Sequence, residues 1–149
     1  MTVMAVPRFK RFFRVAASLD VDKDDLKRYS DFVSTNLYDL LVIAQGTAKA
    51  NDRDIVEPRD LPITKGLQER VHEFRRLDEE LELAPILEQL ATWPPLDVTL
   101  SEETDARLAD VVGGLSVGLA RTFKILDQDT TNPSSEDWER AFGLFDLLL

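Results

Sequence analysis

Residues 24–63 decide the fold and read DDLKRYSDFVSTNLYDLLVIAQGTAKANDRDIVEPRDLPI. Up to residue 50, apolar side chains recur at steps of three and four, which is the period of one face of an α-helix. These side chains are Leu26, Tyr29, Val33, Leu37, Leu40, Ala44 and Ala48. A helix of this length spans roughly 37 Å, the width of a small domain. The sequence therefore predicts a central helix over residues 24–50, on which the shorter elements pack.

The residues after this helix predict a short loop and a further helix. Asn51 is a poor residue for a helix interior, so the long helix should end near residue 50. Ile55 and Val56 form a β-like pair. Pro58 suits the first turn of a helix, and apolar residues continue at helical spacing over 63–77. We therefore expect the next helix to begin at Pro58.

The residues before the long helix predict a short amphipathic helix over 7–17, which begins at Pro7. Its apolar face consists of Phe9, Phe12, Phe13 and Ala16, and its other face of Arg8, Lys10, Arg11 and Arg14. The loop that follows leads to Asp22 and Asp24, either of which has a side chain suited to cap the long helix.

The second half of the chain repeats this order of elements. A short helix is predicted over 85–93, and the loop residues 96–98 match residues 19–21 at an offset of 77. A second long helix is predicted over 102–126, and a last helix begins after Ser134. The repeat predicts two similar halves in one chain.

The second long helix has its own start signal and its own apolar face. Thr99 and Glu102 have the spacing of a capping box. The apolar face contains Leu108, Val111, Val112, Leu115, Leu119, Phe123 and Leu126. Three glycines interrupt this helix at 113, 114 and 118, which predicts a close approach by another element, because glycine otherwise destabilises a helix by roughly 1 kcal/mol.

Neither half can cover the apolar face of its own long helix. We therefore expect the two long helices to cross and bury both faces in one domain over residues 1–149. The halves should meet near residue 83, with one half over about 5–83 and the other over 84–149.

This order of elements resembles the histone fold. Arg53 lies in the loop after the first long helix, and Asp60 follows it seven residues later. Histones carry an arginine and an aspartate at these places, so the resemblance implies an ion pair that holds the loop against the next helix. In the second half Asp137 matches Asp60, but Thr130 stands in place of the arginine. The whole chain resembles the bacterial single-chain double histone-fold proteins, which implies an all-α fold of two tandem histone folds packed as an intramolecular pseudo-dimer.

The composition excludes several classes of function. The chain has no cysteine and its only histidine is His72, so it has no thiolate nucleophile, disulfide or multi-histidine metal site. No apolar run approaches the roughly 20 residues that span a bilayer. Residues 1–7 lack the apolar core of a signal peptide. We expect a cytoplasmic protein without a cofactor, a metal or a membrane partner.

The net charge of −10 is unevenly distributed along the chain. Residues 1–76 carry 14 basic and 12 acidic side chains, whereas residues 77–149 carry 4 basic and 16 acidic side chains, which together make the 18 and 28 of the whole chain. An evenly acidic protein would be repelled by nucleic acid. Here only the second half is strongly acidic.

The main functional candidates are Arg8, Lys10, Arg11, Arg14 and Lys23. The first helices and paired loops of histones face DNA, so the resemblance implies that these side chains lie beside the phosphates of double-stranded DNA. Contacts of this kind give salt-dependent affinity without sequence preference. The alternative interpretation is a solvated polar face over an aromatic core.

Other residues argue against wrapping of DNA as in a nucleosome. Histones usually have a lysine and a threonine after the loop arginine, where this chain has Asp54 and Ile55. Asp127 and Asp129 occupy the corresponding loop of the second half and would repel a duplex. If DNA binds, one end of the molecule should bind it.

The alternative function is that of a protein–protein adaptor without DNA contact. It would use the acidic second half, which could also mimic DNA, and the apolar C-terminal helix, whose residues 144–149 suit self-association or a protein partner. An enzyme is disfavoured because no nucleophile and base stand at a catalytic spacing. Asp20, Asp22 and Asp24 have the first spacing of a calcium loop, but Asp25 stands where that loop needs glycine.

Overall fold

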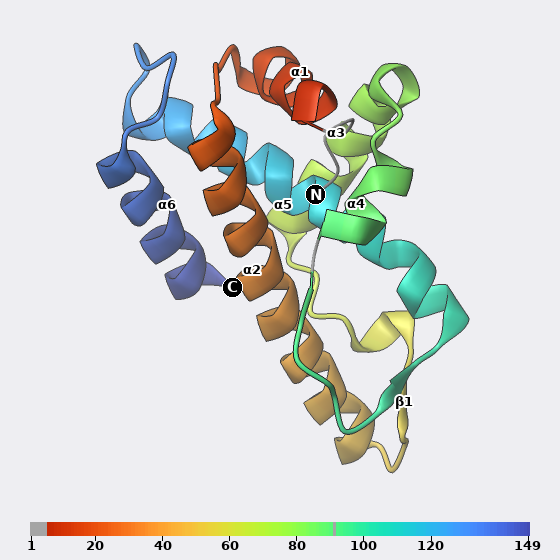
Figure 1. The fold of residues 1–149 in the computed structure, drawn as a ribbon. Coiled ribbons are helices and arrows are strands. Elements are labelled where there is room, and N and C mark those ends of the chain that lie inside the picture. The colour runs from red at the N-terminus through yellow and green to blue at the C-terminus, as the bar shows by residue number, and fades with distance from the viewer. Residues whose placement is uncertain (1–5, 91) are drawn as a thin grey trace.

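A computed structural model describes residues 6–90 and 92–149, which are predominantly helical (Figure 1). In chain order the elements are α1 (Val6–Ala17), α2 (Lys23–Ala50), β1 (Ile55–Val56), the 3₁₀-helix η2 (Pro58–Asp60), α3 (Lys65–Leu81), α4 (Ala84–Leu90), β2 (Thr99–Leu100), α5 (Glu102–Leu126) and α6 (Ser135–Leu148). The two long predicted helices are present within one residue of their expected bounds.

The long helices α2 and α5 contact each other and cross near the middle of the molecule (Figure 1). At the contact, the Tyr29 hydroxyl lies 2.5 Å from the Ser116 hydroxyl. Ser116 in turn donates to the carbonyl of Val112 at 2.7 Å, so Tyr29 is the donor in the first bond. Because Tyr29 is 1% exposed, this bond satisfies a phenol that would otherwise be buried without a partner. Burial raises the pKa of Tyr29, which remains neutral.

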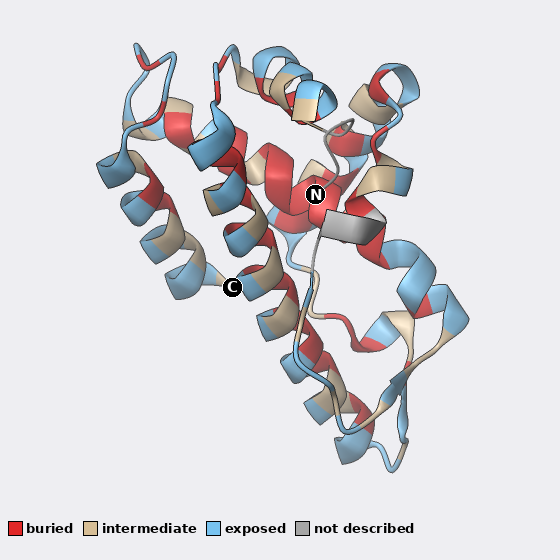
Figure 2. Ribbon diagram, viewed as in Figure 1, coloured by how far each residue is buried: buried red, intermediate tan, exposed pale blue. Residues whose placement is uncertain are grey.

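Helix α5 is the centre of the core, since α1, α2, α3, α4 and α6 all contact it. Residues 111–117 of α5 are all buried, and Figure 2 shows this continuous burial. The buried apolar residues of both halves form one cluster. The predicted close approach at the glycines occurs, but the atoms nearest to Gly113 and Gly114 belong to Phe74 and Val71 of α3 rather than to α2.

The loops of the two halves meet at both ends of the molecule. At one end β1 and β2 pair in parallel, with Ile55 opposite Thr99 and Val56 opposite Leu100. At the other end, the amide of Asp20 donates to the carbonyl of Thr131 at 2.6 Å. Each loop that precedes a long helix therefore contacts the loop that follows the other long helix.

Two predicted element starts are wrong. Pro58 opens only the short η2, and α3 begins at Lys65 with Thr64 as its N-cap. Pro62 disfavours helical backbone at Leu61, which is extended at φ −65° and ψ 126°. In the second half the cap of α5 is Ser101 rather than Thr99.

The shift of this second cap has a structural cause. Thr99 belongs to β2, and its backbone amide donates to the carbonyl of Asp54 at 3.2 Å. An N-cap residue must also turn into the helix, so the backbone pairing moves the cap two residues along the chain.

Candidate functional site

The basic face of α1 consists of Arg8, Lys10, Arg11 and Arg14. The three phenylalanines of the opposite face are buried: Phe9 and Phe13 pack edge to face on Tyr29 at ring distances of 5.6 and 5.1 Å. Phe12 packs on Phe74 of α3 at 6.5 Å. This aromatic packing holds α1 in one rotation about its axis, so the charged side chains face away from the core.

The cations of α1 differ in how much they are engaged. Arg8 donates to the carbonyl of Glu82 at 3.4 Å, and Arg14 pairs with Asp20 at 3.4 Å. Both side chains of the second pair are about 70% exposed, so the pair contributes little to stability. Within the described part of the chain, Lys10 and Arg11 have no hydrogen bond or ion pair.

Lys23 begins α2, but its surroundings are acidic. It directly follows the N-cap Asp22 and precedes Asp24. The loop that contacts Asp20 also contains Asp127 and Asp129, both exposed. The surroundings of Lys23 are therefore more acidic than those of the α1 cations, although all five side chains were predicted to contact DNA together.

The ion pair between Arg53 and Asp60 is present. Both terminal nitrogens of Arg53 donate to the carboxylate of Asp60 at 2.6 Å, and the amide of Glu57 donates to it at 2.8 Å. Asp60 is 3% exposed. These bonds, above all those from Arg53, hold the pKa of Asp60 at about 2, below its usual value of 3.8.

The second half lacks this pair and closes its loop differently. Asp137 accepts a bond from the amide of Ser134 at 2.9 Å as part of a capping box. Lys124 donates to the carbonyl of Thr130 at 2.5 Å. The loop after α5 is thus held by a lysine bond to a backbone carbonyl, whereas the loop after α2 is held by an arginine–aspartate pair.

A buried polar contact between the halves was not foreseen from the sequence. Asp25, 3% exposed, accepts a bond from the indole nitrogen of Trp138 at 2.9 Å. With its amide nitrogen turned toward the carboxylate, Asn132 also donates to Asp25 at 3.2 Å. Burial raises the pKa of Asp25. No local pattern marks this contact, since its partners are 113 residues apart.

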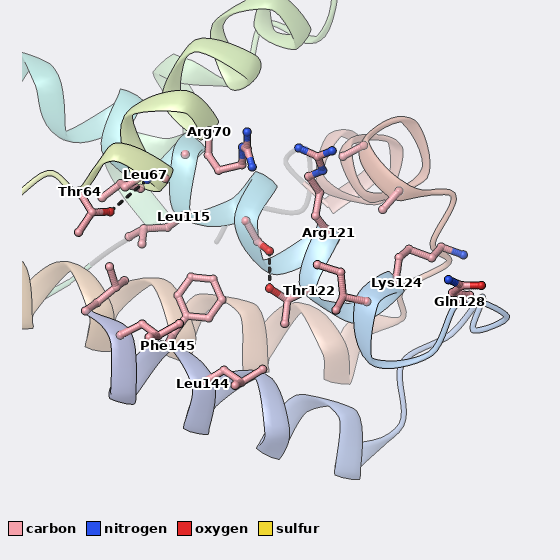
Figure 3. Close-up of a pocket in the computed structure, with 18 residues that line it drawn as sticks. Thr64, Leu67, Arg70, Leu115, Arg121, Thr122, Lys124, Gln128, Leu144 and Phe145 are labelled. Carbon is pink, nitrogen blue, oxygen red and sulfur yellow. Dashed lines mark hydrogen bonds between the residues drawn. The ribbon is translucent and has the colours of Figure 1, made fainter.

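An open groove runs along α5 between α3 and α6, with a volume of about 1120 Å³ (Figure 3). We call it the α5 groove. Its lining includes the apolar side chains of Leu67, Ile125 and Phe145 and the cationic side chains of Arg70, Arg121 and Lys124. Among its lining residues in the described chain, three are cationic and none is acidic. The sequence predicted the apolar C-terminal helix but not the groove that it borders.

Apolar side chains at the end of α6 are exposed beside this groove. Leu147 is 81% exposed and Leu148 is 76% exposed, and Ile125 of α5 is 81% exposed. His72 is exposed on α3, and the described residues contain no group of three or more side chains placed to hold a metal ion. No helix in the described ranges is both long and apolar enough to cross a membrane.

Comparisons with known proteins give a family. The model of a family described as a domain of unknown function, DUF1931, matches residues 9–146. An uncharacterized protein of Aquifex aeolicus (strain VF5) is 31% identical over 139 residues, which are 85% of this chain and 81% of that protein. A second uncharacterized protein of this organism is 25% identical over 117 residues, 78% of this chain and 68% of that protein.

Two solved crystal structures have the same fold. A protein of Thermus thermophilus is 52% identical, with a TM-score of 0.86 and 97% of each chain covered. A protein of Aquifex aeolicus is 23% identical, with a TM-score of 0.85 and 100% of each chain covered. The fold is therefore kept in chains whose sequences differ widely.

Proposed function

We propose that this chain, which belongs to the DUF1931 family, is a non-enzymatic, histone-like binding protein made of two histone folds. Three observations support the histone fold. The order of short, long and short helix occurs twice, loops of opposite halves meet at both ends, and Arg53 pairs with Asp60. The two halves then form one pseudo-dimer with a shared core.

We infer that the basic face of α1 contacts the DNA phosphate backbone. The observation that carries this proposal is the state of Lys10 and Arg11, which project from a rigidly packed helix without a partner among the described residues. Helix α1 contains no acidic residue, so phosphate meets no repulsion from the helix itself.

The charges elsewhere limit this binding to one face. Asp127 and Asp129 are exposed at the end of the molecule that holds Lys23. At the other end, Asp97 already pairs with Lys49 at 2.9 Å. A duplex laid along α1 would be repelled where it passed the first of these ends, so affinity should be modest and should fall steeply with salt.

Removal of the two free cations of α1 tests the DNA proposal. We expect the Lys10→Ala/Arg11→Ala variant to bind duplex DNA more weakly at low salt, and the slope of log K against log salt to fall by about 2. Fluorescence anisotropy with a labelled duplex at several salt concentrations measures both. Arg107→Ala/Arg140→Ala is the control because it removes the same charge elsewhere. No binding by the wild-type chain at low salt, or equal losses in both variants, would exclude this role.

The second candidate is binding of a protein through α6. The supporting observation is the exposure of Leu147 and Leu148, which is unusual for leucines at the end of a packed helix. Self-association through this surface is the simplest form of the proposal, because the same patch on two copies is self-complementary under two-fold symmetry.

Sedimentation over a range of protein concentrations tests this second candidate. We expect the Leu147→Glu variant to dimerise about tenfold or more weakly than the wild type, because burial of one leucine is worth roughly 1.5–3 kcal/mol. Val42→Glu is the control, since Val42 is an exposed apolar residue of α2. A wild-type chain that remains monomeric at all concentrations would exclude self-association through α6.

A further inference from the structure

We propose that the α5 groove is a binding site for an anionic amphiphile, a molecule with a long alkyl chain and a negatively charged head such as a carboxylate. This site would be separate from the basic face of α1, and it does not depend on the DNA proposal. The argument rests on the apolar floor of the groove, its narrow base and the distribution of charge around it.

The floor of the groove is a stripe of α5 that is buried at Gly114, partly exposed at Gly118 and Thr122, and exposed at Ile125. Gly114, Gly118, Thr122 and Ile125 line the groove and recur at steps of four, four and three, so they lie on one face of the helix. Its accessible part, from Gly118 to Ile125, is about 10 Å long, which accommodates much of an extended alkyl chain. Apolar surface of this kind is stabilised when a chain displaces water from it.

The base of the groove is narrow. A single carbon atom added as a Cβ at Gly118 would lie 3.4 Å from Cζ of Phe145 and 3.8 Å from Cγ of Arg70. The walls from α6 and α3 thus approach one carbon from two sides at van der Waals distance. An α-helix with its side chains is about 10–12 Å across and cannot reach this base, whereas a methylene chain can.

Two of the three groove cations lie toward one end of the groove, and Arg70 lies between the two ends (Figure 3). Arg121, Lys124 and Gln128 point toward the end near α1, whereas Leu67, Leu115 and Phe145 lie toward the other end (Figure 3). A molecule that is apolar along its length and charged at one end matches this arrangement.

The cations carry more positive charge than their protein partners neutralise. Arg121 donates to Glu73 at 3.1 Å, and Arg70 Nε lies 3.1 Å from the same carboxylate oxygen. The second contact lacks hydrogen-bond alignment, so Arg70 Nε has no hydrogen-bond partner among the described residues, although Nη2 of Arg70 donates to Glu69 at 3.5 Å. Within the described ranges, Lys124 bonds only a neutral carbonyl, that of Thr130. An anionic head would supply the missing negative charge.

Other occupants match these features less well. A DNA backbone would contact the cations but leave the apolar floor in water. A second copy would bring an α-helix about 10–12 Å across, which can cover the rim of the groove but cannot fill its narrow base. A free phosphate has no apolar part, so it would not contact the narrow apolar base of the groove.

Isothermal titration calorimetry with dodecanoate, kept below the concentration at which it forms micelles, tests this site. We expect saturable binding of one dodecanoate per chain. Dodecyltrimethylammonium, which has the same chain and the opposite charge, should not show this saturable site, although a protein of net charge −10 attracts it generally. The Arg121→Gln/Lys124→Gln variant should bind dodecanoate about tenfold or more weakly, since it removes charge-assisted hydrogen bonds.

Matched variants separate filling of the groove from general effects. Gly66 lines the groove with nothing within 4 Å of an added Cβ, and Gly46 of α2 is equally open but lies outside it. Gly66→Phe should abolish dodecanoate binding, whereas Gly46→Phe and Arg76→Gln/Arg107→Gln should leave it unchanged. Circular dichroism shows whether each variant is folded, and the Arg121→Gln/Lys124→Gln result stands if Gly66→Phe is not.

Three outcomes would overturn the proposal. They are an absence of saturable dodecanoate binding by the wild type, equal binding by the folded Gly66→Phe variant, and equal losses in the two charge variants. If dodecanoate does not bind and Gly66→Phe instead abolishes dimerisation in sedimentation, the occupant of the groove is a second copy of the chain.

Discussion

Replacement of Gly113 by alanine is expected to lower the free energy of unfolding by about 3 kcal/mol, the upper part of the usual range for overpacking a core. An added Cβ would overlap Cγ and Cδ2 of the Phe74 ring, well inside van der Waals contact. Phe74 is 1% exposed and is held against Phe12, so its ring has no free space to enter. Either α3 must move away from α5 or the ring must leave its packed position, and both disturb the core.

Gly46 provides the control for this substitution. It also lies inside a long helix, but nothing is within 4 Å of its added Cβ. Gly46→Ala should therefore stabilise the chain by roughly 0.5–1 kcal/mol, because alanine favours a helix over glycine. Urea unfolding of both variants gives the two values. Equal effects with the same sign would show that helix propensity, rather than the contact with α3, governs position 113.

Replacement of Asp60 by alanine is expected to lower the free energy of unfolding by about 3 kcal/mol, the lower end of the range for breaking a buried ion pair. The substitution removes two bonds from Arg53 at 2.6 Å and one from the amide of Glu57 at 2.8 Å. The freed guanidinium remains partly shielded, with 21% of its side chain exposed. The loop that carries β1 would then lose its attachment to η2.

Asp137 is the matched control within the repeat. Its carboxylate accepts only the capping bond from the amide of Ser134 in the described structure, with no arginine beside it. Asp137→Ala should therefore cost about 1 kcal/mol, as for loss of a helix cap. Urea unfolding at neutral pH compares the two variants. A loss at Asp60 no larger than that at Asp137 would contradict the role of the ion pair.

The effect of Asp60 should also depend on pH. Its folded pKa of about 2 lies below the usual value of 3.8, so its ionisation stabilises the folded state fully above pH 3.8. This contribution is lost as the pH falls from 3.8 through 2, where the folded carboxylate becomes protonated. The difference in unfolding free energy between the wild type and Asp60→Ala should shrink over that window. A constant difference down to pH 2 would show that the carboxylate acts by its shape alone.

The bonds between the halves explain why the two long helices need each other. The Tyr29–Ser116 bond lies where the helices meet, Trp138 bonds Asp25 near the start of α2, and β1 pairs with β2 near its end. Each bond joins a residue of the first half to one of the second. Separation of the halves would leave these polar groups buried without partners or exposed to water, in addition to uncovering the apolar faces.

The sequence alone determined the two long helices. The apolar repeat from Leu26 to Ala48 located α2 within one residue, and the repeat from Leu108 to Leu126 located α5, because an amphipathic helix depends on residues three and four apart. The Arg53–Asp60 pair was also predictable, since its two residues are close along the chain and resemble a known pattern. The helix starts predicted at Pro58 and Thr99 were wrong for different reasons, because Pro62 keeps Leu61 extended after Pro58 whereas backbone pairing places Thr99 in β2.

Only the tertiary structure decided which distant residues meet. Trp138 reaches Asp25 and Phe74 covers Gly113 because helices pack at particular rotations and angles, which no local spacing encodes. The α5 groove exists for the same reason: five helices surround α5, and their packing leaves the stripe from Gly118 to Ile125 partly exposed. Helix formation is governed by near neighbours along the chain, whereas contacts, cavities and their charges are governed by how finished helices fit together.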